Sequence, residues 1–420
     1  MNNTVMILGG SEEFLKLVQL AQSRGITTIV CDGRDNSPAK ALADLSYDIP
    51  VTDIDQIAGV CRKHQVDGIL TGFSDLLLEC MVKIAAAANL PCYLIPEQLP
   101  YYRDKGVMKD TLRDLGIETS QHVLVKAGDN VLEATRGLRM PVVVKPVNLY
   151  GSRDIHVLFD FDQLQEHLDY VFSDSTKGEV LVEEYNDGYE FNLMSWVQDG
   201  QVYLLGIADR EKTEREAGEV PYSCRNVYPS RLLPSVENEA LDILQRYVER
   251  TGQTEGELSM QFFWKPGCRI SVCELAARFL GYEHELIEYA GGTCIEDLLL
   301  DSIYDRDALV GLLEANRRKL TGHAAVLYFH GKNDGVVGSL DGLRKIEDVP
   351  CVRDLWLFYQ EGETVRPFAQ PYFARCTMTA ETRQALDQQT MDVYQLAHVV
   401  NTQDGSELLY QNAMTSYREV

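Results

Sequence analysis

The chain has 420 residues, a net charge of -25 and a pI near 4.7. Its length exceeds the roughly 250 to 300 residues at which a single hydrophobic core stops growing, so we expect two or three domains. A chain this acidic repels a phosphate backbone, which excludes nucleic acid as a partner and requires any phosphate site to be local.

Cysteine usage and the start of the chain bear on the cellular compartment. The ten cysteines include no C-x-x-C pair, and no histidine spacing resembles a zinc site, so we expect reduced thiols in a cytosolic protein. Met1 leads into an apolar strand without a basic leader, and no apolar run reaches the roughly 18 residues of a membrane span. The sequence therefore predicts a soluble, cytoplasmic protein without a membrane partner.

The first hundred residues alternate between two periodicities. Apolar strands are predicted at 5–8, 27–31, 68–71 and 92–94, and helices at 12–24, 54–64 and 76–88. This alternation predicts a parallel sheet covered on both faces. Gly9-Gly10 and Asp32 could belong to an NAD-binding fold, but the third glycine is missing and Glu12 and Glu13 stand where a pyrophosphate would rest. We therefore prefer a tight strand-to-helix turn.

A strand-loop-strand unit follows a predicted helix at 103–115. The buried strand 141–145 ends in Lys145, and the polar loop 148–153 contains Gly151 and Ser152, which can direct backbone N–H groups at an anion. The chain then returns to a strand at 155–158, unlike the strand-loop-helix of a Walker A site. A further strand at 179–183 runs into a turn that places Glu190 seven residues after Glu183.

A predicted hairpin brings two oxygen-bearing side chains together. Gln261 lies on the strand 259–264, Glu274 on the strand 270–276, and a Lys-Pro-Gly turn at 265–267 joins them. Paired oxygen ligands of this kind are typical of Mg²⁺ sites. Arg278 follows four residues after Glu274, and the simplest alternative is a surface ion pair between these two.

In this order, the parts resemble the ATP-grasp superfamily of ATP-dependent carboxylate-amine ligases over roughly residues 5 to 300. The resemblance implies ATP and Mg²⁺ (or Mn²⁺) as cofactors and assigns roles to residues at matching positions. The implied nucleotide-binding residues are Lys105 and Lys145 at the phosphates, Gly151 and Ser152 in a flap, Glu183, Glu184 and Asn186 at adenine, and Glu190 at the ribose. The implied metal ligands are Gln261 and Glu274, and the implied catalytic residues are Arg278 and Lys212, with Arg210 as an alternative to Lys212 and Arg225 as a candidate for a substrate carboxylate.

The resemblance also implies the architecture. We expect an α/β and α+β ATP-grasp fold: an N-terminal Rossmann-like domain at 1–100, an ATP-grasp domain at 101–310, and a small C-terminal α+β lobe at 311–420. Within the ATP-grasp domain, a lid at about 120–190 precedes the metal-bearing part at about 191–310.

Two departures bear on the activity. Ala276 stands where the superfamily often has a metal-binding Asn, as in the amino-acid and dipeptide ligases, whereas Gln261 resembles the carbamoyl-phosphate synthetase branch. We expect an enzyme that activates a small carboxylate, such as an amino acid, and joins it to an amine. The alternatives are a bicarbonate-activating enzyme of the carboxylase or carbamoyl-phosphate type, and a nucleotide-binding protein without turnover. The sequence leaves a homodimer open.

Overall fold

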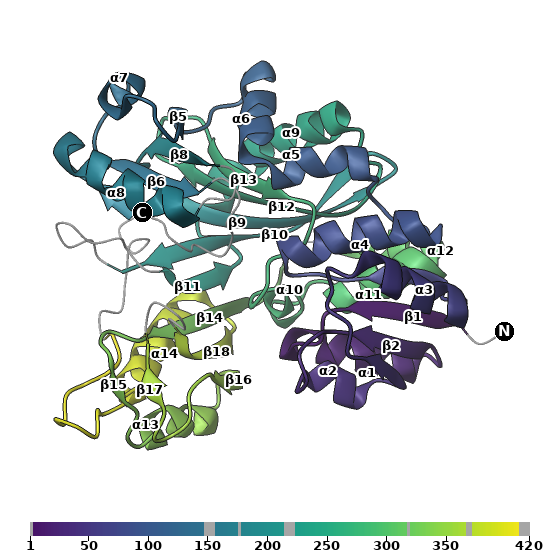
Figure 1. Ribbon diagram of the computed structural model, residues 1–420. Coiled ribbons are helices and arrows are strands. Elements are labelled where there is room, and N and C mark those ends of the chain that lie inside the picture. Colours follow the sequence, from purple (N-terminus) through teal and green to yellow (C-terminus); the bar gives the residue numbers. More distant parts are fainter. Residues whose placement is uncertain are drawn as a thin grey trace.

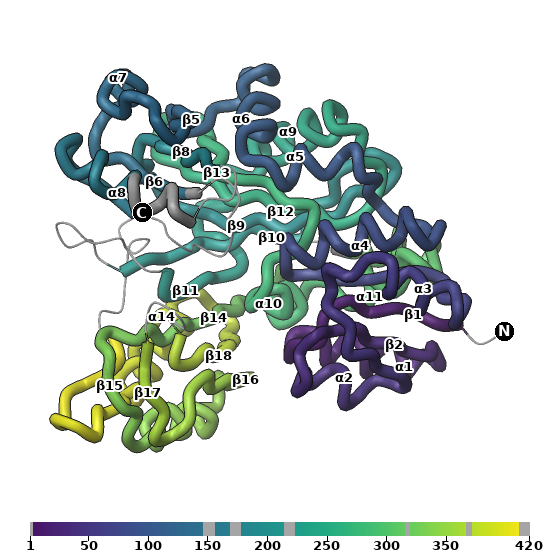
Figure 2. The backbone as a smooth tube through the Cα atoms, viewed as in Figure 1, coloured from purple at the N-terminus to yellow at the C-terminus, as the bar shows by residue number. Residues whose placement is uncertain are grey.

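The computed structural model describes residues 3–146, 156–174, 178–213, 223–316, 320–366 and 372–410. Figure 1 shows a long central sheet with a small sheet beside one end, an N-terminal unit in purple, and a C-terminal lobe in yellow. Figure 2 follows the backbone through these parts in the same view. Among the described residues, no helix combines the length and the apolar character needed to cross a bilayer.

The N-terminal unit is a four-stranded parallel sheet in the order β3-β2-β1-β4. Its strands are β1 (Thr4–Leu8), β2 (Thr27–Cys31), β3 (Leu45–Tyr47) and β4 (Gly68–Leu70). Its helices are α1 (Leu15–Ser23), α2 (Pro38–Leu42), α3 (Ile54–His64) and α4 (Asp75–Ala88). The alternation that the sequence predicted is therefore confirmed for these elements.

The predicted strand at 92–94 is wrong. Residues 92–94 form no strand, and the outer position beside β2 is taken by β3, which the sequence reading missed. Tyr93 explains the difference, because its hydroxyl donates to Ala277 O at 2.9 Å and to Glu257 Oε1 at 3.2 Å. These contacts hold the segment against the large sheet.

The large sheet has eight strands in the order β13-β12-β9-β10-β11-β14-β18-β16, and every neighbouring pair is antiparallel. In that order they are β13 (Ser271–Ala276), β12 (Glu255–Trp264), β9 (Tyr189–Gln198), β10 (Gln201–Lys212), β11 (Ser223–Tyr228), β14 (His323–His330), β18 (Tyr372–Ala380) and β16 (Val352–Leu357).

The two faces of the large sheet differ because side chains alternate along each strand. On β9, Phe191 and Leu193 join the core that includes α9 (Leu233–Thr251). Glu190 and Asn192 are on the opposite face, which is polar at this end and packs at its other end against α10 (Glu285–Tyr289) and α11 (Ile295–Tyr304). The helix α12 (Arg306–Asn316) follows. The site described below is built on this polar face.

The small sheet has the order β5-β8-β6-β7 and its own core. Its strands are β5 (His122–Lys126), β6 (Val142–Pro146), β7 (His156–Leu158) and β8 (Glu179–Glu184), covered by α7 (Val131–Thr135) and α8 (Phe161–Asp174). The linker helices α5 (Leu99–Arg103) and α6 (Lys105–Asp114) precede it and contact β13. The predicted strand-loop-strand unit is confirmed in β6 and β7, and its loop lies outside the described residues.

The C-terminal lobe continues the large sheet. To β14, β18 and β16 it adds β15 (Gly335–Val336), β17 (Thr364–Val365), α13 (Asp341–Arg344) and α14 (Arg383–Leu396) around a third core. The helix α14 begins only after β18 ends at Ala380, and Thr382 caps it by accepting from Ala385 N at 3.2 Å.

Candidate active site

The predicted hairpin is confirmed and carries the candidate metal ligands. β12 pairs with β13 so that Gln261 lies directly opposite Glu274, and the turn at 265–267 closes on Gly267 with a φ of 78°. Within the described part of the chain, the half-buried Glu274 carboxylate accepts no hydrogen bond and forms no ion pair. An amide oxygen beside an uncommitted carboxylate fits Mg²⁺, which binds oxygen donors and retains water ligands.

Glu190 connects this hairpin to two cations on β10. Its Oε1 accepts from Gln261 Nε2 and pairs with Arg210, while its Oε2 lies 2.7 Å from Lys212 Nζ. Burial alone would raise the pKa of Glu190, but the charges of Arg210 and Lys212 lower it to about 2. The predicted residues Glu190, Gln261 and Lys212 therefore meet on one sheet face.

Two lysines share a single carboxylate where the small sheet meets α6. Lys145 Nζ on β6 lies 2.6 Å from Glu183 Oε2, and Lys109 Nζ on α6 lies 2.9 Å from Glu183 Oε1. Burial opposes the charged form, yet the two ammonium groups lower the pKa of Glu183 to about 2. Both lysines are buried or nearly so, and Glu274 contributes to the electrostatic field at Lys145.

Lys109 also reaches this cluster, although the sequence analysis does not single it out. Lys105, which we expect at the phosphates, lies one helical turn earlier, and its charge acts on the carboxyl of Asp75; its role stays a prediction. Residues at i and i+4 lie on the same helix face, so this spacing was the available signal. The side chain of Glu183 is also committed to lysines, so an adenine contact in this segment would have to come from elsewhere.

The other two residues expected at adenine, Glu184 and Asn186, make local contacts. Glu184 accepts from Arg139 N at 2.9 Å and pairs with the Arg139 guanidinium at 2.8 Å. Asn186 Oδ1 accepts from Gly188 N at 3.0 Å and shapes the turn into β9. Recognition of adenine by the backbone groups of this segment stays a prediction. Gly151 and Ser152 lie outside the described residues.

Arg278 is anchored from the N-terminal unit. Its Nε and Nη2 each lie 3.0 Å from a different oxygen of Asp75, at the first turn of α4. Burial raises the pKa of Asp75, but the charge and hydrogen bonds of Arg278 outweigh it and lower that pKa. Glu274 also acts on Arg278 electrostatically. This bidentate pair fixes the orientation of the Arg278 guanidinium near the β12–β13 hairpin, which carries the candidate metal ligands.

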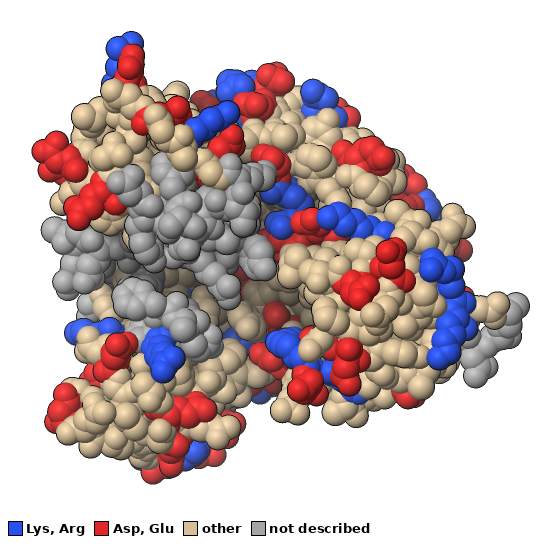
Figure 3. All heavy atoms as spheres, viewed as in Figure 1, with Lys and Arg blue, Asp and Glu red and all other residues tan. Residues whose placement is uncertain are grey.

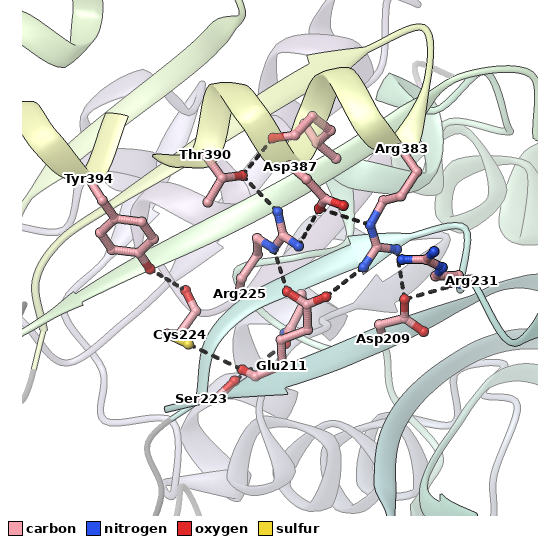
Figure 4. A network of polar contacts seen from close by, with 12 residues as sticks. Asp209, Glu211, Ser223, Cys224, Arg225, Arg231, Arg383, Asp387, Thr390 and Tyr394 are labelled. Atoms are coloured by element: carbon pink, nitrogen blue, oxygen red, sulfur yellow. Dashed lines mark hydrogen bonds and ion pairs between the residues drawn. The ribbon is translucent and has the colours of Figure 1, made fainter. Parts of the chain in front are cut away.

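Arg225 does not face the site, contrary to our expectation for a substrate carboxylate. Figure 4 shows it among acidic residues between β10 and α14. It lies 2.6 Å from both Glu211 and Asp387 and donates to Thr390 Oγ1 at 2.8 Å. Arg225 lies on β11, which pairs with β10, the strand that carries Arg210 and Lys212.

Acidic residues in and around the turn after β1 already have hydrogen-bond partners. Asp32 Oδ2 accepts from Gly10 N at 2.8 Å and pairs with Arg34 at 2.7 Å, while Glu13 Oε1 accepts from Tyr282 N at 2.8 Å. These carboxylates stand where an anion would approach the helix. The structure agrees with a structural turn here.

Charged side chains gather around a central hollow. Figure 3 shows this face of the molecule hollowed between its upper and lower parts, with acidic and basic side chains on the walls. The mixture of charges suits a ligand that combines a polyanion with cations.

Comparisons with known proteins agree with this geometry. A family model described as the phosphoribosylglycinamide synthetase ATP-grasp (A) domain matches residues 103–224. The chain is 25% identical over 279 residues to a formate-dependent phosphoribosylglycinamide formyltransferase of Erythrobacter litoralis, covering 65% of this chain and 70% of that protein. It is 24% identical over 250 residues to the carbamoyl phosphate synthase large chain of Clostridium perfringens, covering 58% of this chain but only 23% of that one.

A solved structure resembles nearly the whole chain. The L-amino acid ligase from Bacillus licheniformis superposes with a TM-score of 0.80 at 18% identity, covering 96% of this chain and 99% of the ligase. The predicted fold, with its N-terminal sheet, ATP-grasp core and C-terminal lobe, is therefore confirmed. The family model thus matches an ATP-grasp domain at 103–224, and the solved ligase extends the similarity in fold to nearly the whole chain.

Proposed function

We propose that this protein is an ATP-dependent ligase, which activates a small carboxylate as an acyl-phosphate and couples it to an amine with release of ADP and phosphate. The observation that carries the proposal is the convergence of three groups of residues: the two lysines on Glu183, the cations on Glu190, and the oxygen pair Gln261–Glu274. It acts in the cytoplasm on small molecules.

Charge neutralisation explains why these groups are needed. Transfer of the γ-phosphoryl group to a carboxylate brings two anions together, so fixed cations must offset their repulsion. Lys109 and Lys145 hold the phosphates nearer the adenosine, and Lys212 and Arg278 hold the transferred γ-phosphoryl group. Gln261 and Glu274 would hold Mg²⁺, which would supply further positive charge. ATP would displace some of the internal ion pairs, since lysine and arginine would exchange a carboxylate for a phosphate.

The acidic residues near the turn after β1 favour an amine substrate without a phosphate group. The anion-binding position after β1 carries Glu12 and Glu13, and the nearby Asp32 already binds Gly10 N. These acids oppose a substrate phosphate. We therefore favour an amino acid or a related metabolite over the phosphoribosyl compound in the name of the formyltransferase relative.

The second candidate is activation of bicarbonate. It is supported by the match to the carbamoyl phosphate synthase large chain and by Gln261 as a metal ligand. It requires ATP turnover that depends on bicarbonate and persists without any amino acid.

The test is a turnover screen. Purified protein is incubated with ATP, Mg²⁺, hydroxylamine as the acceptor and a panel of amino acids, and ADP and hydroxamate are measured. We expect hydroxamate with at least one carboxylate, and its loss in Lys145→Met. Lys126→Met is the matched control, because Lys126 is on the same small sheet with its side chain 65% exposed. Turnover with bicarbonate alone would support the second candidate, whereas ATP binding without turnover would overturn both.

A further inference from the structure

Glu283 is a buried carboxylate on the same sheet face as the phosphate-binding cations. It lies in the segment between β13 and α10 and is 3% exposed. Its Oε1 accepts from Asn192 Nδ2 at 2.7 Å, and its Oε2 accepts from Asn226 Nδ2 at 3.2 Å and Tyr228 OH at 3.3 Å. Asn192 follows Glu190 by two residues on β9, and Asn226 is directly opposite Arg210 in the β10–β11 pair. Glu283 therefore lies next to the Glu190–Arg210 pair.

Among the residues that the structure describes, the surroundings of Glu283 provide neutral hydrogen-bond donors but no cation paired with its carboxylate alone. Arg210 acts on it electrostatically but is paired with Glu190. The tyrosines that face it, Tyr228 and Tyr328, keep their protons, since burial holds their pKa values well above 10.0. Burial likewise raises the pKa of Glu283 to about 7, and the three hydrogen bonds and Arg210 only partly offset it. A carboxyl in such a place changes its charge near neutral pH.

Contacts on the neighbouring residues hold Glu283 in place. The His284 ring stacks on Phe73 with centroids 4.1 Å apart, and its Nδ1 lies 3.1 Å from Glu285. Glu285 also pairs with Arg375 on β18 at 3.0 Å. The segment is thereby tied to both the N-terminal unit and the C-terminal lobe. Burying an acid without a dedicated cation costs stability, and such perturbed carboxyls cluster at functional sites.

We propose that Glu283 binds the ammonium group of the amine substrate and accepts its proton. This inference rests on the proposed function. The ammonium N–H bond breaks and its proton moves to a Glu283 oxygen, leaving the lone pair on nitrogen. That pair forms the C–N bond at the acyl carbon, the C–O bond to phosphate breaks, and phosphate leaves with its electron pair. A second amine proton passes to the departing phosphate, so the products are the amide and hydrogen phosphate.

The experiment compares two acceptors in the same enzyme. A substrate that binds as an ammonium ion needs a base to remove a proton before its nitrogen can attack. Hydroxylamine is mostly unprotonated at neutral pH, so its attack does not need this base. In Glu283→Gln, which keeps the shape of the side chain, we expect amide formation to fall about 10²- to 10⁴-fold and hydroxamate formation by less than about tenfold. The wild-type kcat/KM for the amine should rise with pH through about 7. This rising limb of the pH profile should be missing with hydroxylamine as the acceptor and in the Glu283→Gln variant.

A matched control separates this role from burial of an acid as such. Glu257 is also fully buried with its pKa raised, to about 8, but it accepts from Phe279 N at 2.7 Å and from Tyr93. Glu257→Gln should keep the pH limb. Equal losses with both acceptors in Glu283→Gln, or a limb that disappears only in Glu257→Gln, would overturn the proposal. If Glu283→Gln does not fold, the wild-type comparison of the two acceptors decides it. A wild type that forms no hydroxamate with any carboxylate would instead refute the proposed function.

Discussion

The paired lysines on Glu183 lead to a quantitative prediction about nucleotide binding. Lys109, Lys145 and Glu183 together carry one net positive charge, and Lys109→Met reduces it to zero. With an effective dielectric constant of about 20 and a separation of about 6 Å, one unit charge interacts with a phosphate charge by about 3 kcal/mol. Because 1.4 kcal/mol is a factor of ten, we expect ATP to bind about 100-fold more weakly.

Isothermal titration of ATP at constant ionic strength measures this effect, with urea unfolding to verify that each variant is folded. The double variant Lys109→Met/Glu183→Gln restores the net charge and should recover most of the lost affinity. Lys105→Met should weaken binding far less. The reasoning is refuted if the Lys105 variant shows the 100-fold loss while the Lys109 variant binds normally, or if the double variant binds no better than Lys109→Met alone.

Three further predictions concern the metal, the C-terminal lobe and acid. Glu274→Gln should raise the Mg²⁺ concentration needed for half-maximal turnover by about 10- to 100-fold while leaving Mg²⁺-free ATP binding nearly unchanged; an unaltered Mg²⁺ titration would contradict the ligand role. Arg225→Met should lower the free energy of unfolding by about 3–5 kcal/mol in urea, because it leaves buried acids without their partner, and should not alter ATP affinity. Glu183 and Glu190 have pKa values of about 2, below the ordinary 4.5. Each therefore contributes about 3 kcal/mol to the free energy of unfolding, which is present above pH 4.5 and lost as the pH falls toward 2. Glu190→Gln should make the free energy of unfolding depend less steeply on pH between those values.

Local patterns predicted the fold where they were long and regular. Apolar strands alternating with helices predicted most of the N-terminal unit, and the Lys-Pro-Gly turn predicted the β12–β13 hairpin. The sequence failed where a strand lacks an apolar pattern: β3 and β4 both have three residues, but β4 is fully buried whereas β3 is largely exposed. Residues 92–94 look like a strand but are held by the Tyr93 hydroxyl through partners more than 160 positions away.

The site shows the same division between local and distant information. Gln261 and Glu274 could be paired from the sequence because a hairpin connects neighbours in the chain. The partner of Arg278 could not be predicted, because Asp75 is 203 positions away, on the helix α4 of the N-terminal unit. Lys109 and Lys105 are both on α6, and only the fold decides which ammonium group reaches Glu183. Glu283 has no motif, since its properties come from burial.

The alternation of β10 gives a physical reason for the C-terminal lobe to matter to the chemistry. Arg210 and Lys212 point to Glu190, so Asp209 and Glu211 must point to the opposite face. There Arg383 at the start of α14 lies 2.7 Å from Asp209 and 2.5 Å from Glu211, as Figure 4 shows. Displacing α14 would therefore release the same strand that presents both cations to the phosphate end of the site, so the lobe and the site are coupled through the two faces of one strand.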